Sequence, residues 1–534
     1  MKKARKISSV VLAMITIICI VIIIPVNVSA NDEQSEFDKN YDNKDNEEII
    51  LSCGNYEYRI LDDGTAEITE YKGNENEVTI PNNLDGLSVT SIGVDPFKNH
   101  HQTLTSVIIP DSVNSISISG FQGCENLKNI TIGKNVVDIG WWAFSDCSSL
   151  ESVVIPDSVI NLGNCAFWGC SKLSEITIGN SVTSINESTF AYCPNLTDVT
   201  IGNSVTEVRG YSFMNCTNIK TIIIPNSVTY IQSSAFAGCT GLSELTLGNS
   251  VAYIDSGAFM DCTNLKSVVL PNSVKTIREF AFRNCSNLSN VTLGKNVSYI
   301  GKGAFYNCCK LQSIVIPPSV EHIEEYAFGY YEDDDDISSI DYGFEIIGYK
   351  KTEAEFYADL YRLNFTPLFS AKLGKARIYV GDTTTVKAVG EGVSGITTYK
   401  SSNKSIATVT SNGVIKGIKS GVATITVKNN DVTDDVIITV MKKSNPMKVT
   451  AKSTVTASSK KKTTIKKAIT VKKAQGTVSY KTDNKKVTVK SGTMTVAKGL
   501  KKGKTYKVKI TVTAKGNNNY KSQKIVKTIK IKVK

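Results

Sequence analysis

The chain has 534 residues, of which 41% are hydrophobic and 8% aromatic, a composition typical of folded, water-soluble protein. This excludes a disordered or fibrous chain, and the length predicts several domains. The formal net charge of +11 hides an asymmetry. Residues 442–534 carry 28 lysines against one acid, Asp483, whereas residues 31–441 carry 29 basic and 49 acidic residues. Two electrostatically opposite parts therefore share one chain.

The first 30 residues have the three parts of a secretory signal peptide. A basic start at residues 2–6 precedes an apolar run at residues 10–24 and the small-residue ending Val28-Ser29-Ala30. The alternative is a retained membrane anchor, but a membrane-spanning helix needs about 20 apolar residues. We expect cleavage, no retained transmembrane segment, and a secreted protein. Residues 31–50 are interpreted as a linker.

A repeat of 23 residues organises the middle of the chain. Cysteine recurs at this spacing at positions 124, 147, 170, 193, 216, 239, 262, 285 and 308. Phenylalanine recurs at positions 121, 144, 167, 190, 213, 236, 259, 282, 305 and 328. A fixed period in the twenties is the signature of a solenoid, whose coils bury their hydrophobic faces only by stacking on one another.

Within one coil, Leu150, Val153 and Ile155 have the spacing of a short strand, and Phe167 and Cys170 close the following turn. This pattern resembles the BspA-like, or treponemal, class of leucine-rich repeats over residues 81–330. The resemblance extends to a hairpin cap in residues 51–80 and to a helix-and-strand cap in residues 331–369. It implies a capped solenoid of about ten coils.

A second period lies on top of the first. The residue after each coil's strand alternates between proline (110, 156, 225, 271 and 317) and glycine (133, 179, 202, 248 and 294), with one slip in phase between Gly179 and Gly202. We infer that the solenoid grew by duplication of a two-coil unit.

The periodic cysteines allow two interpretations. Stacked coils place like positions about 5 Å apart, a separation that a disulfide tolerates. Nine equally spaced cysteines cannot all pair, however, and each stands where a small buried hydrophobic residue is needed. We therefore expect the ladder to be reduced and buried. Cys53, Cys165 and Cys309 lie off the ladder and are the candidates for oxidation.

Two β modules follow the repeats. Residues 370–442 contain short alternating runs bounded by glycine, which predict a small antiparallel sandwich. Ser401-Ser402-Asn403, with the glycines at 413, 417 and 421, resembles the bacterial Ig-like group 2 domain. The expected fold class is therefore mainly β: a leucine-rich-repeat solenoid of about ten 23-residue coils with caps, followed by Ig-like β-sandwich modules.

The last module, residues 446–534, also alternates. Ile529, Ile531 and Val533 should face one way while Lys530 and Lys532 face the other, as in a strand with a lysine face. The module resembles lysine-rich Ig-like or cadherin-like modules of secreted proteins from low-GC Gram-positive bacteria. One interpretation is a solvated face; the other is retention on anionic wall polymers such as teichoic acids, because lysine binds phosphate as a point charge.

No motif for catalysis is present. The GxSxG, HExxH, P-loop and CxxC spacings are missing, and the chain has three histidines. We expect no enzymatic activity, no cofactor and no metal. The acidic residues 333–336 with Asp341 depart from the EF-hand pattern and are interpreted as a solvated insert. The basic tail contains no arginine and few aromatic residues, so we expect no nucleic-acid partner.

Recognition is expected on the solenoid surface. The exposed strand position forms a row that alternates apolar residues and threonine: Ile108, Thr131, Val154, Thr177, Thr200, Ile223, Thr246, Val269, Thr292 and Val315. Aromatic residues form a column (Tyr230, Tyr253 and Tyr299) and a cluster (Trp141, Trp142 and Trp168). Exposed aromatic residues are favoured interface anchors. The alternative is that the row only favours strands and the tryptophans cover the core.

The family resemblance implies adhesion to host proteins or to other cells, whereas the sequence itself indicates a display architecture. We expect a secreted, adhesin-like interaction protein of a Gram-positive-type bacterium, extracellular or associated with the cell wall, that binds a protein or glycan through its solenoid. The alternative is a structural or wall-associated protein that its basic C-terminal module holds on anionic wall polymers.

Overall fold

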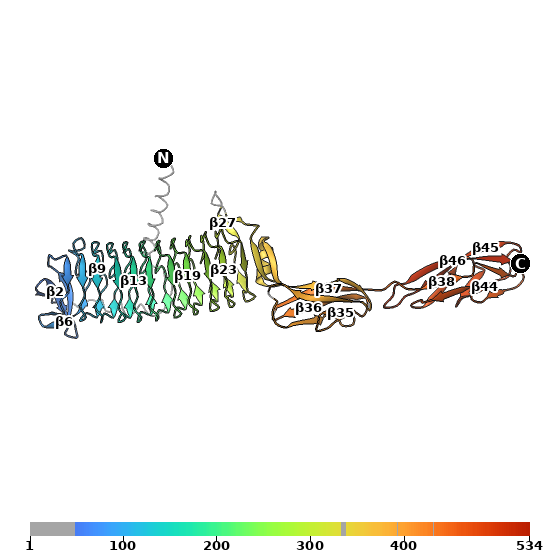
Figure 1. Ribbon diagram of the computed structural model, residues 1–534, viewed down its shortest axis with the longest axis horizontal. Coiled ribbons are helices and arrows are strands. Elements are labelled where there is room, and N and C mark those ends of the chain that lie inside the picture. The colour runs from blue at the N-terminus through green and yellow to red at the C-terminus, as the bar shows by residue number, and fades with distance from the viewer. Residues whose placement is uncertain (1–48, 333–337, 392, 431) are drawn as a thin grey trace, which may run out of the picture. The chain divides into compact units, whose positions relative to one another are not determined.

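The computed structural model describes residues 49–332, 338–391, 393–430 and 432–534 (Figure 1). The predicted signal peptide, most of the predicted linker and the acidic residues 333–336 lie outside the described residues. Within these ranges the fold is mainly β, as expected, and α2 (Glu353–Tyr361) is the one helix. No helix of the described residues is long and apolar enough to cross a bilayer.

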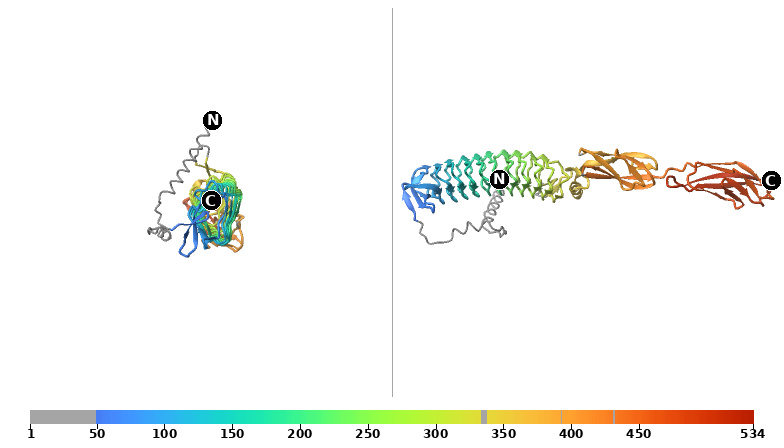
Figure 2. Two further views of the ribbon diagram at one scale, coloured as in Figure 1. Left: turned by 90° about the vertical axis from the view of Figure 1, so that its left-hand side faces the viewer. Right: turned by 90° about the horizontal axis from the view of Figure 1, so that it is seen from below.

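The repeat region winds into a β-solenoid of about 13 turns, in which the end turns continue the stacking of the regular 23-residue coils (Figure 1). Each regular coil has two short strands, and the strands of successive coils form two parallel rows. The end-on view in Figure 2 shows successive coils superposed along the stack. The register follows the sequence period, because Val153 pairs with Ile176 and Ile176 pairs with Val199.

The first strand row consists of β4 (Glu77–Thr79), β7 (Ser106–Ile108), β9 (Asn129–Thr131), β11 (Ser152–Val154), β13 (Glu175–Thr177), β15 (Asp198–Thr200), β17 (Thr221–Ile223), β19 (Glu244–Thr246), β21 (Ser267–Val269), β23 (Asn290–Thr292), β25 (Ser313–Val315), β29 (Glu345–Tyr349) and β30 (Asn364–Leu373). The second row consists of β6 (Leu87–Ile92), β8 (Ser115–Ile116), β10 (Asp138–Ile139), β12 (Asn161–Leu162), β14 (Ser184–Ile185), β16 (Glu207–Val208), β18 (Tyr230–Ile231), β20 (Tyr253–Ile254), β22 (Thr276–Ile277), β24 (Tyr299–Ile300) and β26 (His322–Ile323).

The core of the solenoid is a continuous stack of phenylalanine rings. From Phe97 to Phe328, each ring lies 5.0–5.5 Å, centroid to centroid, from the ring of the next coil, and the planes differ by 1–19°. These rings are fully buried. Offset stacking at this distance adds to the gain from burying each ring, so every coil stabilises both of its neighbours.

Both ends of the stack are closed by aromatic side chains. At the N-terminal end, β1 (Leu51–Cys53), β2 (Tyr56–Ile60), β3 (Ala66–Tyr71) and β5 (Asn83–Leu84) form a cap, in which Tyr71 lies 5.5 Å from Phe97. At the other end, Tyr357 of α2 meets Phe328 edge-on, and its hydroxyl accepts a hydrogen bond from the Phe328 N–H. A hairpin of β27 (Tyr330–Glu332) and β28 (Ser338–Ile340) precedes this cap.

The alternation of proline and glycine has a steric cause. A Cβ atom on Gly133, Gly179, Gly248 or Gly294 would lie 2.2–2.3 Å from the carbonyl oxygen of the proline one coil earlier. Real Cβ atoms do not approach a backbone oxygen so closely, so a coil that follows a proline coil needs glycine here. Gly202, where the alternation slips, has the same restriction against the Gly179 oxygen at 2.4 Å.

The cysteine ladder occupies the interior, as expected for a small buried residue. All nine ladder cysteines are buried. From Cys147 onward each thiol donates a hydrogen bond of 3.1–3.4 Å to the phenylalanine carbonyl of the preceding coil, as Cys216 does to Phe190. Burial raises the pKa of Cys124 to about 12 and raises the pKa of Cys262 well above the ordinary value of a thiol. Cys309 is exposed, and Cys53 and Cys165 are half-buried.

The Ig-like module contains β31 (Arg377–Tyr379), β32 (Thr383–Val389), β33 (Thr397–Ser401), β34 (Ala407–Val409), β35 (Val414–Gly417), β36 (Gly421–Asn429) and β37 (Val432–Met441). It is the expected sandwich, with a core that includes Val386, Ile415, Ile425 and Ile438. Strand β30 links it to the repeats, because its first half pairs with β29 and its second half with β32.

The last module contains β38 (Lys448–Ala451), β39 (Thr454–Ala457), β40 (Thr463–Ile465), β41 (Ile469–Lys472), β42 (Val478–Thr482), β43 (Val487–Lys490), β44 (Thr493–Val496), β45 (Thr505–Ala514) and β46 (Gln523–Val533). Its largest sheet has the order β39-β46-β45-β42. The predicted alternation in β46 is confirmed, since Ile529, Ile531 and Val533 are buried while Lys530 and Lys532 are exposed.

Substitution of one stacked ring tests this core. Phe213 lies 5.3 Å from Phe190 and 5.1 Å from Phe236, so Phe213→Ala opens a cavity against two neighbouring coils. We expect a loss of about 3–5 kcal/mol in the free energy of unfolding, measured by denaturant titration. Tyr211→Ala, at an exposed position of the same coil, is the control. An unchanged midpoint for Phe213→Ala would show that the stack does not hold the solenoid together.

Thiol labelling tests the cysteine ladder. In the native protein we expect rapid alkylation of Cys309, slower alkylation of Cys53 and Cys165, and none of the ladder, because burial blocks access and disfavours the reactive thiolate. In denatured but unreduced protein, most ladder cysteines should label, as counted by mass spectrometry. A count near zero after denaturation would contradict a reduced ladder.

Candidate functional site

The predicted row of recognition residues lies on one face of the first strand row. The third residue of each strand points outward, and exposed fractions reach 67% at Val154, 64% at Ile223 and 65% at Val269. All ten predicted positions are exposed except Thr177, which is half-buried. Backbone pairing places like positions side by side, as for Ile223 and Thr246. The structure thus aligns the ten residues in one ladder along the stack. Among these described strands, backbone pairing is interrupted between β9 and β11, β15 and β17, β19 and β21, and β23 and β25.

A polar ladder runs beside it. The first residue of each strand lies on the same face, because only the central residue turns inward, and this first residue is polar in every regular coil. Glu175 and Asp198 pair directly, and Glu244 follows two coils later. The face therefore combines a partly apolar row with hydrogen-bonding and acidic groups, a composition that suits a protein or glycan surface.

The predicted tyrosine column is only partly available. The hydroxyls of Tyr230 and Tyr299 donate hydrogen bonds of 2.6 and 2.5 Å to Asp255 and Glu324. Burial, followed by these hydrogen bonds, raises the pKa of each of the two phenols to about 12. Tyr253 is 44% exposed, and its ring meets that of Tyr230 edge-on at 5.8 Å. Tyr253 is therefore the member best placed to contact a ligand.

The three predicted tryptophans divide into two groups. Trp141 and Trp142 are 47% and 38% exposed, and their rings meet nearly at right angles at 6.2 Å. Trp168 is half-buried and packs edge-on against Tyr192 at 5.6 Å. Among the described residues, no ring contact joins Trp168 to the other two. The exposed anchor is thus the Trp141–Trp142 pair.

An apolar extension of that pair was missed in the sequence. Ile118 occupies the Trp141 position one coil earlier and is 45% exposed, and the Ser119 N–H donates to the Trp141 carbonyl at 2.8 Å. Val94, in the coil before, is 56% exposed. The sequence did contain a signal for this extension, namely the 23-residue spacing between Ile118 and Trp141. A search for aromatic residues alone could not find Ile118, because isoleucine is not aromatic.

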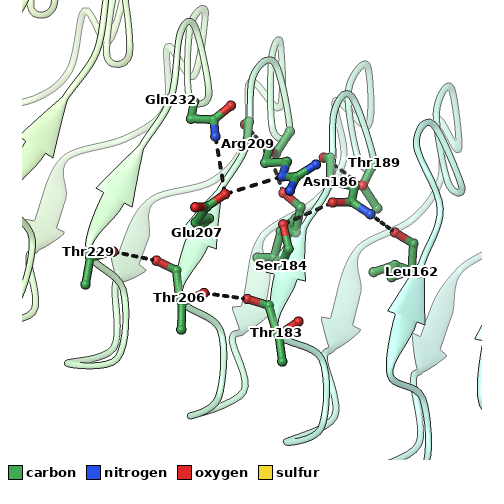
Figure 3. Close-up of polar contacts among 12 residues, drawn as sticks. Leu162, Thr183, Ser184, Asn186, Thr189, Thr206, Glu207, Arg209, Thr229 and Gln232 are labelled. Atoms are coloured by element: carbon green, nitrogen blue, oxygen red, sulfur yellow. Dashed lines mark hydrogen bonds and ion pairs between the residues drawn. The ribbon is translucent and has the colours of Figure 1, made fainter. Parts of the chain in front are cut away.

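Several polar side chains in the middle coils form hydrogen bonds within the solenoid (Figure 3). The Thr206 and Thr229 hydroxyls each donate to the carbonyl 23 residues earlier, at 3.1 and 3.3 Å. Glu207 lies 3.4 Å from both Arg209 and Gln232. These contacts connect neighbouring coils and place no nucleophile beside a base.

The histidines have structural surroundings. His100 contacts the Gly73 carbonyl at 2.7 Å, His101 lies 2.9 Å from Asp95, and His322 is exposed in β26. Across the described ranges, no group of three histidine, cysteine, aspartate or glutamate side chains is placed to hold a metal ion.

The last module presents a second candidate surface. On the outer side of the sheet β39-β46-β45-β42, the residues Lys507, Lys509, Lys530 and Lys532 are exposed on the two central strands. Lys507 stands directly opposite Lys530. In the described part of the chain, no ion pair involves a lysine beyond Lys443.

Comparison with known families identifies the type of the repeats. Residues 90–220 and 206–333 match the BspA type leucine rich repeat region, in six copies. The repeats are of the BspA type. Residues 375–440 match the bacterial Ig-like domain, group 2. The resemblances of these two regions are therefore confirmed, whereas the resemblance of residues 446–534 stays a prediction. A search of curated proteins finds no match.

Solved structures with similarity to this chain include leucine-rich repeat proteins. One is a leucine rich cell surface protein from Faecalibacterium prausnitzii, 29% identical, covering 60% of this chain and 94% of its own, with a TM-score of 0.39. A leucine-rich repeat protein from Bacteroides capillosus is 32% identical over 21% of this chain and 84% of its own, with a TM-score of 0.19. The pneumococcal vaccine antigen PcpA is 19% identical over 60% and 98%, with a TM-score of 0.35. The assignment rests on the family matches, since these scores are low.

The repeat family indicates a protein-interaction role at the cell surface, and it is a family not known for catalysis. The exposed ladder, the Trp141–Trp142 pair and the lysine face are the surfaces on which such interactions can form.

Proposed function

We propose that the protein is a secreted, adhesin-like interaction protein without catalytic activity, which binds a protein or glycan ligand through the exposed ladder of its solenoid. The observation that carries this proposal is the continuity of the ladder. Ten coils present the same strand position outward, and the most exposed apolar side chains at this position are 64–67% exposed. Because neighbouring coils fix its backbone, such a surface loses little conformational entropy on binding.

The aromatic residues supply the second part of the proposed surface. Trp141 and Trp142 are large, rigid side chains with little rotamer entropy to lose, which is why tryptophan is enriched among residues that dominate binding energy. Tyr253 is likewise exposed and can contact a ligand. The proposed location is extracellular or associated with the wall of a Gram-positive-type bacterium.

Binding of the full-length protein to arrays of matrix proteins and glycans tests the proposal. We expect binding to at least one class, and a loss of affinity of about tenfold or more on Ile223→Lys combined with Val269→Lys, because two central contacts become charged. Ile160→Lys combined with Ile437→Lys is the control, since these residues are 50% and 62% exposed and lie away from the ladder and from the lysine face. Equal losses in both variants, or no binding to any array, would contradict ligand binding by the ladder.

We also propose retention on anionic wall polymers as a second function, for one reason. Residues 442–534 have a net charge of +27, and the solenoid side of the chain is acidic. A polyanion is attracted to the C-terminal end through summed charge, within the screening length of about 8–10 Å.

Salt dependence tests retention. We expect the full-length protein to bind purified Gram-positive walls at low salt, and to bind much less at physiological salt or after removal of teichoic acids, because counterions screen the lysines. A chain that ends at residue 445 is the control and should not bind. Equal binding in all four conditions of salt and wall treatment would refute electrostatic retention.

A further inference from the structure

We propose that the outer face of the sheet β39-β46-β45-β42 is a docking site for a linear phosphate-containing polymer without bases, which lies across the two central strands. This inference rests on the proposed retention function. It assigns polymer binding to one face of the last module rather than to the total charge of that module. The site residues are Lys507, Lys509, Lys530 and Lys532, with the threonines between them.

The register places four charges close together. Lys507 pairs with Lys530 across β45 and β46, and Lys532 lies two residues further along β46, with Lys509 two residues further along β45. Neighbouring strands are about 4.8 Å apart, and residues on one face of a strand about 6.7 Å apart. Because Lys532 stands opposite Thr505 and Lys509 opposite Thr528, these two lysines lie on opposite sides of the Lys507–Lys530 pair, and the four form a diagonal row on one side of the sheet.

Among the described residues of the module, no carboxylate forms an ion pair with these four lysines. Its one acid, Asp483, accepts a hydrogen bond from the Lys509 backbone N–H at 2.9 Å. Like charges directly opposite each other in a sheet are destabilising. Lys507 and Lys530 therefore repel each other in the folded module, because no carboxylate lies beside the pair. A polyanion that binds there neutralises both charges and so removes this repulsion.

The residues between the lysines fit the same ligand. Lys530 is flanked on β39 by Thr454, Lys532 by Thr456 on one side and Thr505 on the other, and Lys509 faces Thr528. Hydroxyls donate hydrogen bonds to phosphate oxygens or to a polyol, and lysine supplies the charge. No aromatic side chain lies among these positions, so the face lacks the stacking platforms that single-stranded nucleic acids use.

The opposite sheet provides an internal contrast. In the sheet β40-β44-β43, the middle positions of the outer face that pair across the strands are Thr464, Thr495 and Thr488, of which Thr464 and Thr488 are exposed and Thr495 is half-buried. Its lysine Lys490 pairs with Thr493 rather than with another lysine. Of these two sheets, only the one with β45 and β46 pairs lysine with lysine; a second exposed pair, Lys448 and Lys472, lies on β38 and β41.

Charge-matched variants of the full-length protein test the site. The probe is fluorescently labelled linear polyphosphate, with inorganic monophosphate as competitor and single-stranded DNA as a second ligand. Lys507→Glu and Lys490→Glu change the net charge equally, but Lys507→Glu also gives Lys530 an ion-pair partner and should not destabilise the module. Lys530→Gln is the second variant of the site.

We expect Lys507→Glu and Lys530→Gln to weaken polyphosphate binding about tenfold or more, and to lower the dependence of log affinity on log salt by about 1 for each lysine lost. Lys490→Glu should change the affinity by less than about twofold. Monophosphate should compete poorly, and DNA should bind more weakly than polyphosphate at equal charge.

Three results would overturn the site. Equal losses in Lys507→Glu and Lys490→Glu would show diffuse attraction, which would leave retention intact and remove the local site. Stronger binding of DNA than of polyphosphate would assign the face to nucleic acid. Absence of polyphosphate binding by the unchanged protein, even at low salt, would remove both the site and the proposed retention.

Discussion

The stacking of one coil on the next is the constraint on which the rest of the structure depends. A single coil of 23 residues has no interior of its own, so its phenylalanine, cysteine and leucine positions become buried only when the neighbouring coil supplies the other wall. Ring separations of 5.0–5.5 Å from Phe97 to Phe328 show how uniformly this is achieved. The aromatic caps at Tyr71 and Tyr357 then prevent the two ends from exposing that interior.

The same stacking creates the surface. Because every coil repeats with the same register, whatever the sequence places at an outward position becomes a straight row of side chains. The row from Ile108 to Val315 and the hydroxyl ladder through Thr206 and Thr229 both arise in this way. Variation between coils is therefore concentrated in surface columns, and a ligand would recognise which residues occupy neighbouring coils rather than a pocket.

Electrostatics separates the two ends of the chain. The solenoid region is acidic, and some of its acidic residues form local ion pairs, such as Arg278–Asp255. The last module, in contrast, has one acid and many lysines. A mixed surface of the first kind favours specific contacts, and a surface of one sign favours polyanions and is sensitive to salt. The proposed display and retention functions therefore fall to different modules.

Much of this architecture could be predicted from the sequence, because a solenoid's period, its buried positions and its outward row all follow from residue spacing alone. The ladder, the buried cysteines and the alternating faces of β46 were predictable for this reason. The sequence could not show contacts between residues that are far apart in the chain, or contacts of residues that do not follow the 23-residue repeat. Only the folded chain revealed that Asp255 and Glu324 engage Tyr230 and Tyr299, that Ile118 extends the tryptophan pair, and that Lys507 faces Lys530. These depend on strand register and on side-chain direction, which tertiary packing sets, whereas spacing depends only on the chain.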